Sequence, residues 1–144
     1  MTTPITFDLS SSDYDAQLGF DVLLNNKVVF TTEHVSAPAT VTIDIVDDTE
    51  GEHELKFVLK NKTNEHTRVD EHGNILNDAM LSVANVAFDN VKLGHVLVEQ
   101  AVYHHDTNGS QSLSEHKFYG NMGCNGHVSL KFTTPVYIWL LEHT

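Results

Sequence analysis

Histidine and carboxylate side chains gather between His104 and His116. His104, His105 and Asp106 are consecutive, and imidazole together with carboxylate suits zinc, copper or nickel. The spacing matches no closed zinc motif, so a histidine-bearing surface loop is the commoner explanation. The acidic run 47–50 lacks the alternating carboxylates and the glycine of an EF-hand loop. We therefore interpret that run as the solvated tip of a hairpin.

Groups that could act as nucleophiles lack the sequence context of a catalytic site. The serines at 10–12 have no nucleophile-elbow pattern, and Cys124 lies in a Gly/Asn turn with no signature for a histidine base. Paired carboxylates occur only as turn clusters. We therefore predict that the protein is not an enzyme. The single cysteine also excludes a disulfide framework within these residues.

Aromatic side chains in loops are candidates for contact with sugars, because aromatic faces pack against the apolar faces of pyranose rings. Tyr14 lies in a loop between Asp13 and Asp15, and Tyr119 stands next to a glycine. We expect these four residues to bind a ligand: the tyrosine rings by stacking and the two carboxylates by accepting hydrogen bonds.

The elements that must position these side chains are strands. Apolar and polar residues alternate over 5–9, 40–45, 52–59 and 128–132, a period of two that is typical of strands with one buried face. The expected inward-facing residues are Ile5, Phe7, Leu9, Val41, Ile43, Ile45, Leu55, Phe57, Leu59, Val128, Leu130 and Phe132.

Local signals place the turns between these strands. Asn25 and Asn26 tolerate positive φ and predict a hairpin between residues 18–24 and 27–31. The alternation over 80–88 breaks near Asn85, which indicates a β-bulge. We expect a further long strand over 96–103.

The apolar run 136–141 predicts a closing strand that is apolar on both faces. Trp139 in this run is expected to be buried, either between sheets or in a subunit interface. Strands that alternate in this way must bury one face against a second sheet. We therefore predict an all-β fold, an antiparallel β-sandwich of jelly-roll type with about eight to ten strands. A chain of 144 residues without a break in composition predicts a single domain over residues 1–144.

The charge of the chain limits its partners. Twenty acidic residues against eight basic ones give a formal net charge of −12, which repels phosphate backbones and anionic lipid heads. We expect no nucleic-acid partner. No apolar stretch is long enough for a transmembrane helix, so we expect no membrane insertion. Protonation of the ten histidines would offset part of this negative charge, so association is expected to depend on pH.

Three runs resemble the small calcium-dependent xylan-binding carbohydrate-binding modules. Residues 19–29 match a strand that ends in a Val-Asn-Gly-Lys type hairpin, and 51–61 match a Gly-x-His-x-Leu strand that enters an Asn-Asp corner. Residues 78–86 match an Asp-Arg-Asn-Leu segment that leads into a strand. The resemblance covers about two thirds of the chain and implies non-catalytic glycan binding assisted by calcium.

The resemblance also implies where calcium would bind. Asn61 and Asp78 keep oxygen ligands at the matching positions, and Asn77 is an additional donor beside Asp78. The chain departs from the family at Lys62, which replaces the corner carboxylate. Since calcium takes six to eight oxygen ligands, the site would have to borrow Asn77, Glu65 or Asp70 from the polar insertion before Asp78.

The chain as a whole is similar to small conserved proteins of T4-like marine cyanophages. The similarity is carried by residues 57–63, 101–109 and 123–142. It implies a virion or host-surface role, with localisation in the virion or the host-cell cytoplasm.

Two functions follow from these patterns. The first is a carbohydrate-binding-like module whose partner is a glycan. The second is a structural or assembly protein of a phage particle, a decoration, tail or fibre-associated protein that binds another particle protein or forms a homo-oligomer. Glycan binding needs a cleft with convergent oxygens and an aromatic platform, whereas assembly needs an apolar patch or a free strand edge.

Overall fold

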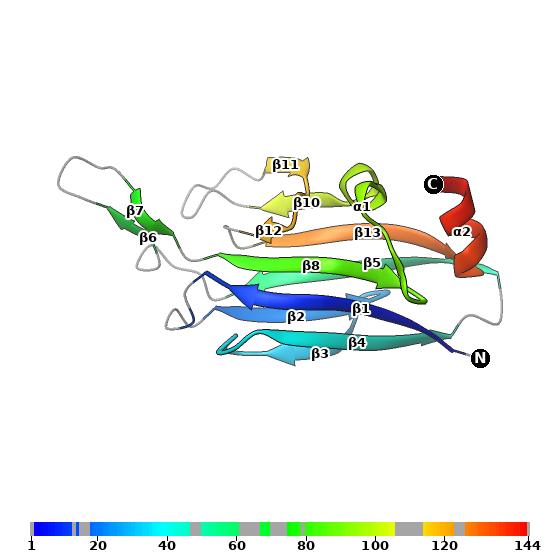
Figure 1. Ribbon diagram of the computed structural model, residues 1–144, viewed down its shortest axis with the longest axis horizontal. Coiled ribbons are helices and arrows are strands. Elements are labelled where there is room, and N and C mark those ends of the chain that lie inside the picture. Colours follow the sequence, from blue (N-terminus) through cyan, green and yellow to red (C-terminus); the bar gives the residue numbers. More distant parts are fainter. Residues whose placement is uncertain are drawn as a thin grey trace.

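Two antiparallel sheets stacked face to face form the body of the chain (Figure 1). The computed structural model describes residues 2–12, 14, 18–46, 50–60, 67–69, 75–78, 80–105, 114–122 and 126–143, with the backbone alone at 67–69, 75–78, 105 and 114. A separate two-stranded ribbon, β6 (Thr67–Val69) and β7 (Ile75–Asp78), projects from one end of the sandwich in Figure 1.

The front sheet in Figure 1 has five strands. Its order is β12-β8-β1-β4, and β9 pairs with β8. The strands are β1 (Thr2–Ser11), β4 (Ala39–Val46), β8 (Leu81–Phe88), β9 (Val91–Lys92) and β12 (Asn121–Met122).

The second sheet has six strands in the order β11-β10-β13-β5-β2-β3. The chain crosses repeatedly between the two sheets, so sequence neighbours such as β4 and β5 lie in opposite layers. This arrangement confirms the predicted antiparallel β-sandwich of jelly-roll type, although thirteen strands form among the described residues where eight to ten were expected. The strands are β2 (Gly19–Leu24), β3 (Lys27–Thr32), β5 (Gly51–Lys60), β10 (Val102–His105), β11 (Ser114–Lys117) and β13 (Gly126–Thr134).

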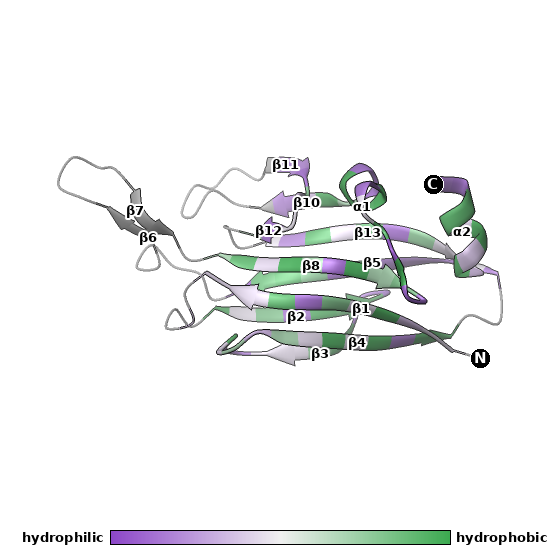
Figure 2. Ribbon diagram, viewed as in Figure 1, coloured by the Kyte–Doolittle hydropathy of each residue, from purple (hydrophilic) through white to green (hydrophobic). Residues whose placement is uncertain are grey.

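The core lies between the sheets and follows from the alternation in the sequence. Every predicted inward-facing residue is buried. Figure 2 shows hydrophobic and hydrophilic residues alternating along β8 and β13. Phe7 of one sheet meets Phe57 of the other edge to face, with ring centroids 4.9 Å apart, a favourable arrangement for aromatic pairs.

Two predicted local features are confirmed. Asn25 (φ 53°) and Asn26 (φ 66°) form the tight turn between β2 and β3. Asn85 has φ 54°, and the pairing of β1 with β8 shifts register beside it, from Thr6 opposite Ala87 to Asp8 opposite Ala84. This bulge puts an extra residue into β8 at the outer face of the sheet.

Two predicted strands are wrong because the segments are helical. Residues 95–100 form α1 (His95–Gln100), which starts after Gly94 at φ 54°. Only residues 102 and 103 of the expected strand pair, as the start of β10. The closing run forms α2 (Val136–His143), which buries Val136, Trp139 and Leu140. A short, wholly apolar run has no period that separates helix from strand. The expected burial of Trp139 is confirmed at 3% exposure.

Within the described ranges, neither helix has the length and apolar character that crossing a membrane requires.

Candidate functional site

Tyr119 is held out on the surface by its two neighbours. Phe118 before it is fully buried. Gly120 after it has φ 108°, a conformation that favours glycine, and its carbonyl accepts the amide of Val83 at 2.8 Å. The chain is thus anchored to the core and to β8 on either side of Tyr119. Tyr119 itself is 74% exposed.

The ring stands at a groove of about 350 Å³ between β8, α1 and the segment 118–121, which we call the Tyr119 groove. The accessible apolar residues Ala84 and Val98 give it an apolar floor. Polar groups come from Ser82, Asn85 and Asn121, and no charged side chain is among the described residues that line it.

One hydrogen bond fixes the polar side of the Tyr119 groove. Ser82 and Asn121 are cross-strand partners, and the Ser82 hydroxyl donates to Asn121 Oδ1 at 2.6 Å. The amide nitrogen of Asn121 keeps its hydrogens for another acceptor, since the described part of the chain supplies none. An apolar floor with a few oriented polar groups is the usual composition of a small-molecule site.

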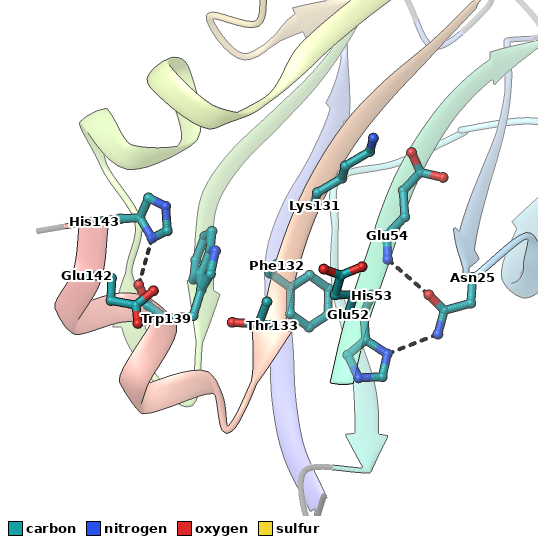
Figure 3. A pocket seen from close by; sticks show the side chains of 10 residues that line it. All are labelled: Asn25, Glu52, His53, Glu54, Lys131, Phe132, Thr133, Trp139, Glu142 and His143. Atoms are coloured by element: carbon teal, nitrogen blue, oxygen red, sulfur yellow. Dashed lines mark hydrogen bonds between the residues drawn. The ribbon is translucent and has the colours of Figure 1, made fainter. Parts of the chain in front are cut away.

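A larger pocket, of about 630 Å³, lies beside α2 (Figure 3). We call it the α2 pocket. Its rim is ionic, with Glu52 and Glu54 from β5, Lys131 from β13 and Glu142 from α2. Trp139 also lines it but is only 3% exposed. The α2 pocket therefore offers charges and little open aromatic surface.

A hydrogen-bonded chain holds His53 at the floor of the α2 pocket (Figure 3). The Glu54 amide donates to Asn25 Oδ1 at 2.9 Å, so the Asn25 amide nitrogen faces His53 Nδ1, 3.0 Å away, as the donor. His53 Nδ1 is thus an acceptor and the ring carries its proton on Nε2, 3.2 Å from Thr134 Oγ1. The ring also stacks on Phe132 at 5.4 Å. His53 is consequently a fixed part of the wall.

Tyr14, the other predicted stacking residue, is not part of the lining of the Tyr119 groove. Tyr14 is partly buried against the core, and its carbonyl accepts from His34 Nε2 at 2.6 Å. Asp13 and Asp15 lie outside the described residues.

The predicted calcium ligands are not tested by the structure. Asn77 and Asp78 belong to β7, where their backbones pair with Arg68 and Thr67. Their side chains, and the whole of Asn61, lie outside the described part. Among the described residues, no three His, Cys, Asp or Glu side chains are placed to hold a metal ion.

The predicted histidine cluster is only partly described. His104 Nδ1 lies 3.2 Å from Glu115, and its ring stacks on His127 at 4.9 Å. Burial, and then the nearby His104, lowers the pKa of His127. Asp106 and the His105 side chain lie outside the described residues.

Sequence reasoning missed most of the groove. Ser82 and Asn121 meet only because β8 and β12 are neighbours, and nothing in the sequence pairs two segments so far apart. The α2 pocket was missed because α2 was expected to be a strand. The usable signals were Tyr119 beside its glycine and the bulge at Asn85.

No protein-family model and no curated protein matches the chain. Two solved structures are similar. One is the selenomethionine form of vCBM60, from work on a circular permutation that links two families of calcium-dependent carbohydrate-binding modules, with a TM-score of 0.56, 14% identity and 89% of each chain covered. The other is vCBM60 in complex with galactobiose, with a TM-score of 0.49, 15% identity, and 88% of this chain and 96% of that chain covered. The likeness to the former confirms, at the level of the fold, the resemblance to calcium-dependent carbohydrate-binding modules.

Proposed function

We propose that this protein is a non-catalytic carbohydrate-binding module that stacks a sugar ring on Tyr119. The observation that carries the proposal is the 74% exposed tyrosine beside an apolar floor and an oriented amide. The fold shared with a calcium-dependent carbohydrate-binding module supports it.

Binding in the Tyr119 groove uses two complementary surfaces of a sugar. The C–H face of a pyranose packs on the Tyr119 ring, and the backbone that carries this ring is already anchored by Phe118 and Gly120. The sugar hydroxyls accept from the Asn121 amide nitrogen and donate to the Ser82 hydroxyl oxygen, whose own hydrogen is given to Asn121. These groups bind and orient a ligand, and none of them is a nucleophile paired with a base.

The test is a screen of neutral oligosaccharides followed by calorimetric titration of Tyr119→Ala. We expect the variant to lose at least about tenfold in affinity, because an exposed aromatic platform carries a large share of such binding energy. The matched control is Tyr137→Ala, since Tyr137 is also a largely exposed tyrosine (63%) but lies on α2, outside the groove. Equal affinities for the Tyr119 and Tyr137 variants would contradict the assignment.

We further propose that calcium assists this module through the 61–78 segment. Amide and carboxylate oxygens are the donors that calcium prefers, and Asn61, Asn77 and Asp78 supply that chemistry. When bound, the ion would add a fixed positive charge and open coordination positions for hydroxyl oxygens. A ligand that binds only the folded state raises its unfolding midpoint. We expect millimolar calcium to raise the midpoint of the chelated protein, and Asp78→Ala to abolish the rise; an unchanged midpoint would remove calcium from the proposal.

One observation favours the second function, assembly into a phage particle without glycan binding. Tyr137, Ile138 and Leu141 expose apolar surface on α2, by 63%, 40% and 73% respectively. Adjacent exposed apolar side chains are typical of contact surfaces. The mass of the protein in solution tests the homo-oligomer version: a dimer disrupted by Leu141→Glu would support it, and a monomer at all concentrations would oppose it.

A further inference from the structure

We infer that the binding surface continues from the Tyr119 groove across the outer face of the five-stranded sheet to a second subsite at Asp8, so that the ligand is an internal stretch of a neutral linear oligosaccharide. This inference rests on the proposed function and names the class of glycan. Apart from Asn85, which lines both depressions, it concerns residues other than those of the Tyr119 groove.

The second subsite is a depression of about 300 Å³ on the same outer face. Asp8 of β1 lies at its centre, with Thr40 and Asn85 on the neighbouring strands. Thr40 Oγ1 donates to Asp8 Oδ1 at 2.8 Å, and Asn85 Nδ2 donates to Asp8 Oδ2 at 2.7 Å. Both carboxylate oxygens are therefore fixed by neighbours, and these two hydrogen bonds lower the pKa of Asp8.

Asn85 joins the two depressions, since it lines both. Its position follows from the bulge: at φ 54° it interrupts the alternation of β8, and its side chain reaches Asp8 on the next strand. In Figure 1 this face of β8, β1 and β4 looks toward the viewer with no described element in front of it.

The geometry gives the surface a length. The polar groups run across the strand order β12-β8-β1-β4, from Asn121 to Thr40. Three strand spacings of about 4.8 Å make roughly 14 Å. That distance is longer than one sugar ring, so a linear chain lying across the strands would touch both depressions.

The charges select the class of chain. The described lining of the Tyr119 groove carries no charged group, and the second depression balances one carboxylate, Asp8, against one ammonium, Lys92. A surface without net charge that presents amides and hydroxyls suits the hydroxyl groups of neutral sugars and gives no counterion to a charged one.

The experiment measures the affinity of the whole chain for neutral β-linked galactan, xylan and cellulose oligosaccharides from disaccharide to hexasaccharide. We expect the affinity to rise with length until both depressions are occupied. Thr40→Val and Lys92→Ala each remove one polar group from the second depression and should reduce the gain from length roughly three- to tenfold, as loss of a hydrogen bond does. They should leave disaccharide binding unchanged.

Two further variants make the result specific. Thr42→Val is the matched control for Thr40→Val, since Thr42 is the next exposed threonine on β4 and does not line the second depression. Asn85→Gly keeps the positive φ that the bulge requires and removes the shared side chain, so it should weaken binding of short and long chains alike.

The outcomes separate this inference from the proposed function. If Tyr119→Ala abolishes binding while affinity is independent of length, or while Thr40→Val and Thr42→Val behave alike, the module stands and the second subsite is overturned. If no oligosaccharide binds the native chain, both are overturned.

Discussion

Ser129 of β13 and Glu54 of β5 are hydrogen-bonded to each other across two neighbouring strands of the six-stranded sheet. The buried Ser129 hydroxyl donates to Glu54 Oε2 at 2.6 Å, and Lys56 lies 3.5 Å from the same carboxylate. The hydrogen bond from Ser129 is the main cause of a lowered Glu54 pKa, opposed by burial and supported by Lys56. A lowered pKa in the folded state means that the ionised carboxylate stabilises the fold.

Ser129→Ala is predicted to lower the free energy of unfolding by about 1 kcal/mol at neutral pH, the usual worth of such a bond. Because the folded pKa lies below the unfolded one, this contribution is fully present above about pH 5. It is lost as the pH falls through the folded value, where both states bind the proton. Urea unfolding of both proteins across a pH series measures the difference.

The double variant isolates the pair. In a Glu54→Gln background the same Ser129→Ala change should lower the free energy of unfolding by less than it does in the native background. That smaller loss should not vary with pH, because the ionisable partner is gone. A pH-independent cost in the native background would show that Ser129 contributes by packing alone.

Residues that act through their own backbone could be predicted from the sequence, and residues that act through distant partners could not. Asn25, Asn26 and Asn85 sit at positive φ, a local preference that the sequence displays. Tyr119 was a candidate because it stands beside a glycine. Asn121 and Asp8 acquire their roles only from strands brought beside them by the fold.

At the scale of elements, α2 shows why the spacing of apolar residues did not distinguish a helix from a strand. In a strand, residues 139 and 141 would share one face, whereas in a helix they lie on nearly opposite sides. Trp139 is 3% exposed and Leu141 is 73% exposed, which is the helical pattern. Val96 and Leu97 of α1 mislead in the same way, because valine and leucine runs fit a buried strand equally well.

Trp139→Ala is predicted to cost about 3 to 5 kcal/mol, because it removes a ring that stacks on Phe88 at 5.6 Å and leaves a cavity at the end of the core. Leu141→Ala, on the same helix, is predicted to change stability by no more than about 0.5 kcal/mol. Equilibrium unfolding in urea compares the two directly. Similar losses for both variants would contradict the orientation of α2.

At the scale of the whole molecule, the class of fold was predictable because the alternation repeats along the chain, and each repeat independently demands a second sheet. The position of the binding face was not. The bulge, α1 and the 118–121 segment hollow the outer face of the five-stranded sheet, and α1 was expected to be a strand. The proposed binding therefore depends on the irregular parts of a regular sandwich.

The net charge of the chain and the uncharged lining of the proposed groove predict different effects of salt on binding. The chain carries −12, yet the described lining of the Tyr119 groove is uncharged. Salt shortens the screening length from about 10 Å at 0.1 M to about 3 Å at 1 M, which weakens attraction between charges and leaves stacking and neutral hydrogen bonds in place. We predict that the affinity for a neutral oligosaccharide changes less than about twofold over this range.

Chitosan, a polycation, is the charged control. It should bind only at low salt, and equally well to the native protein and to Tyr119→Ala, since the acidic surface as a whole would attract it. A steep, Tyr119-dependent loss of neutral-sugar binding in salt would place a charged group of the protein in direct contact with the sugar.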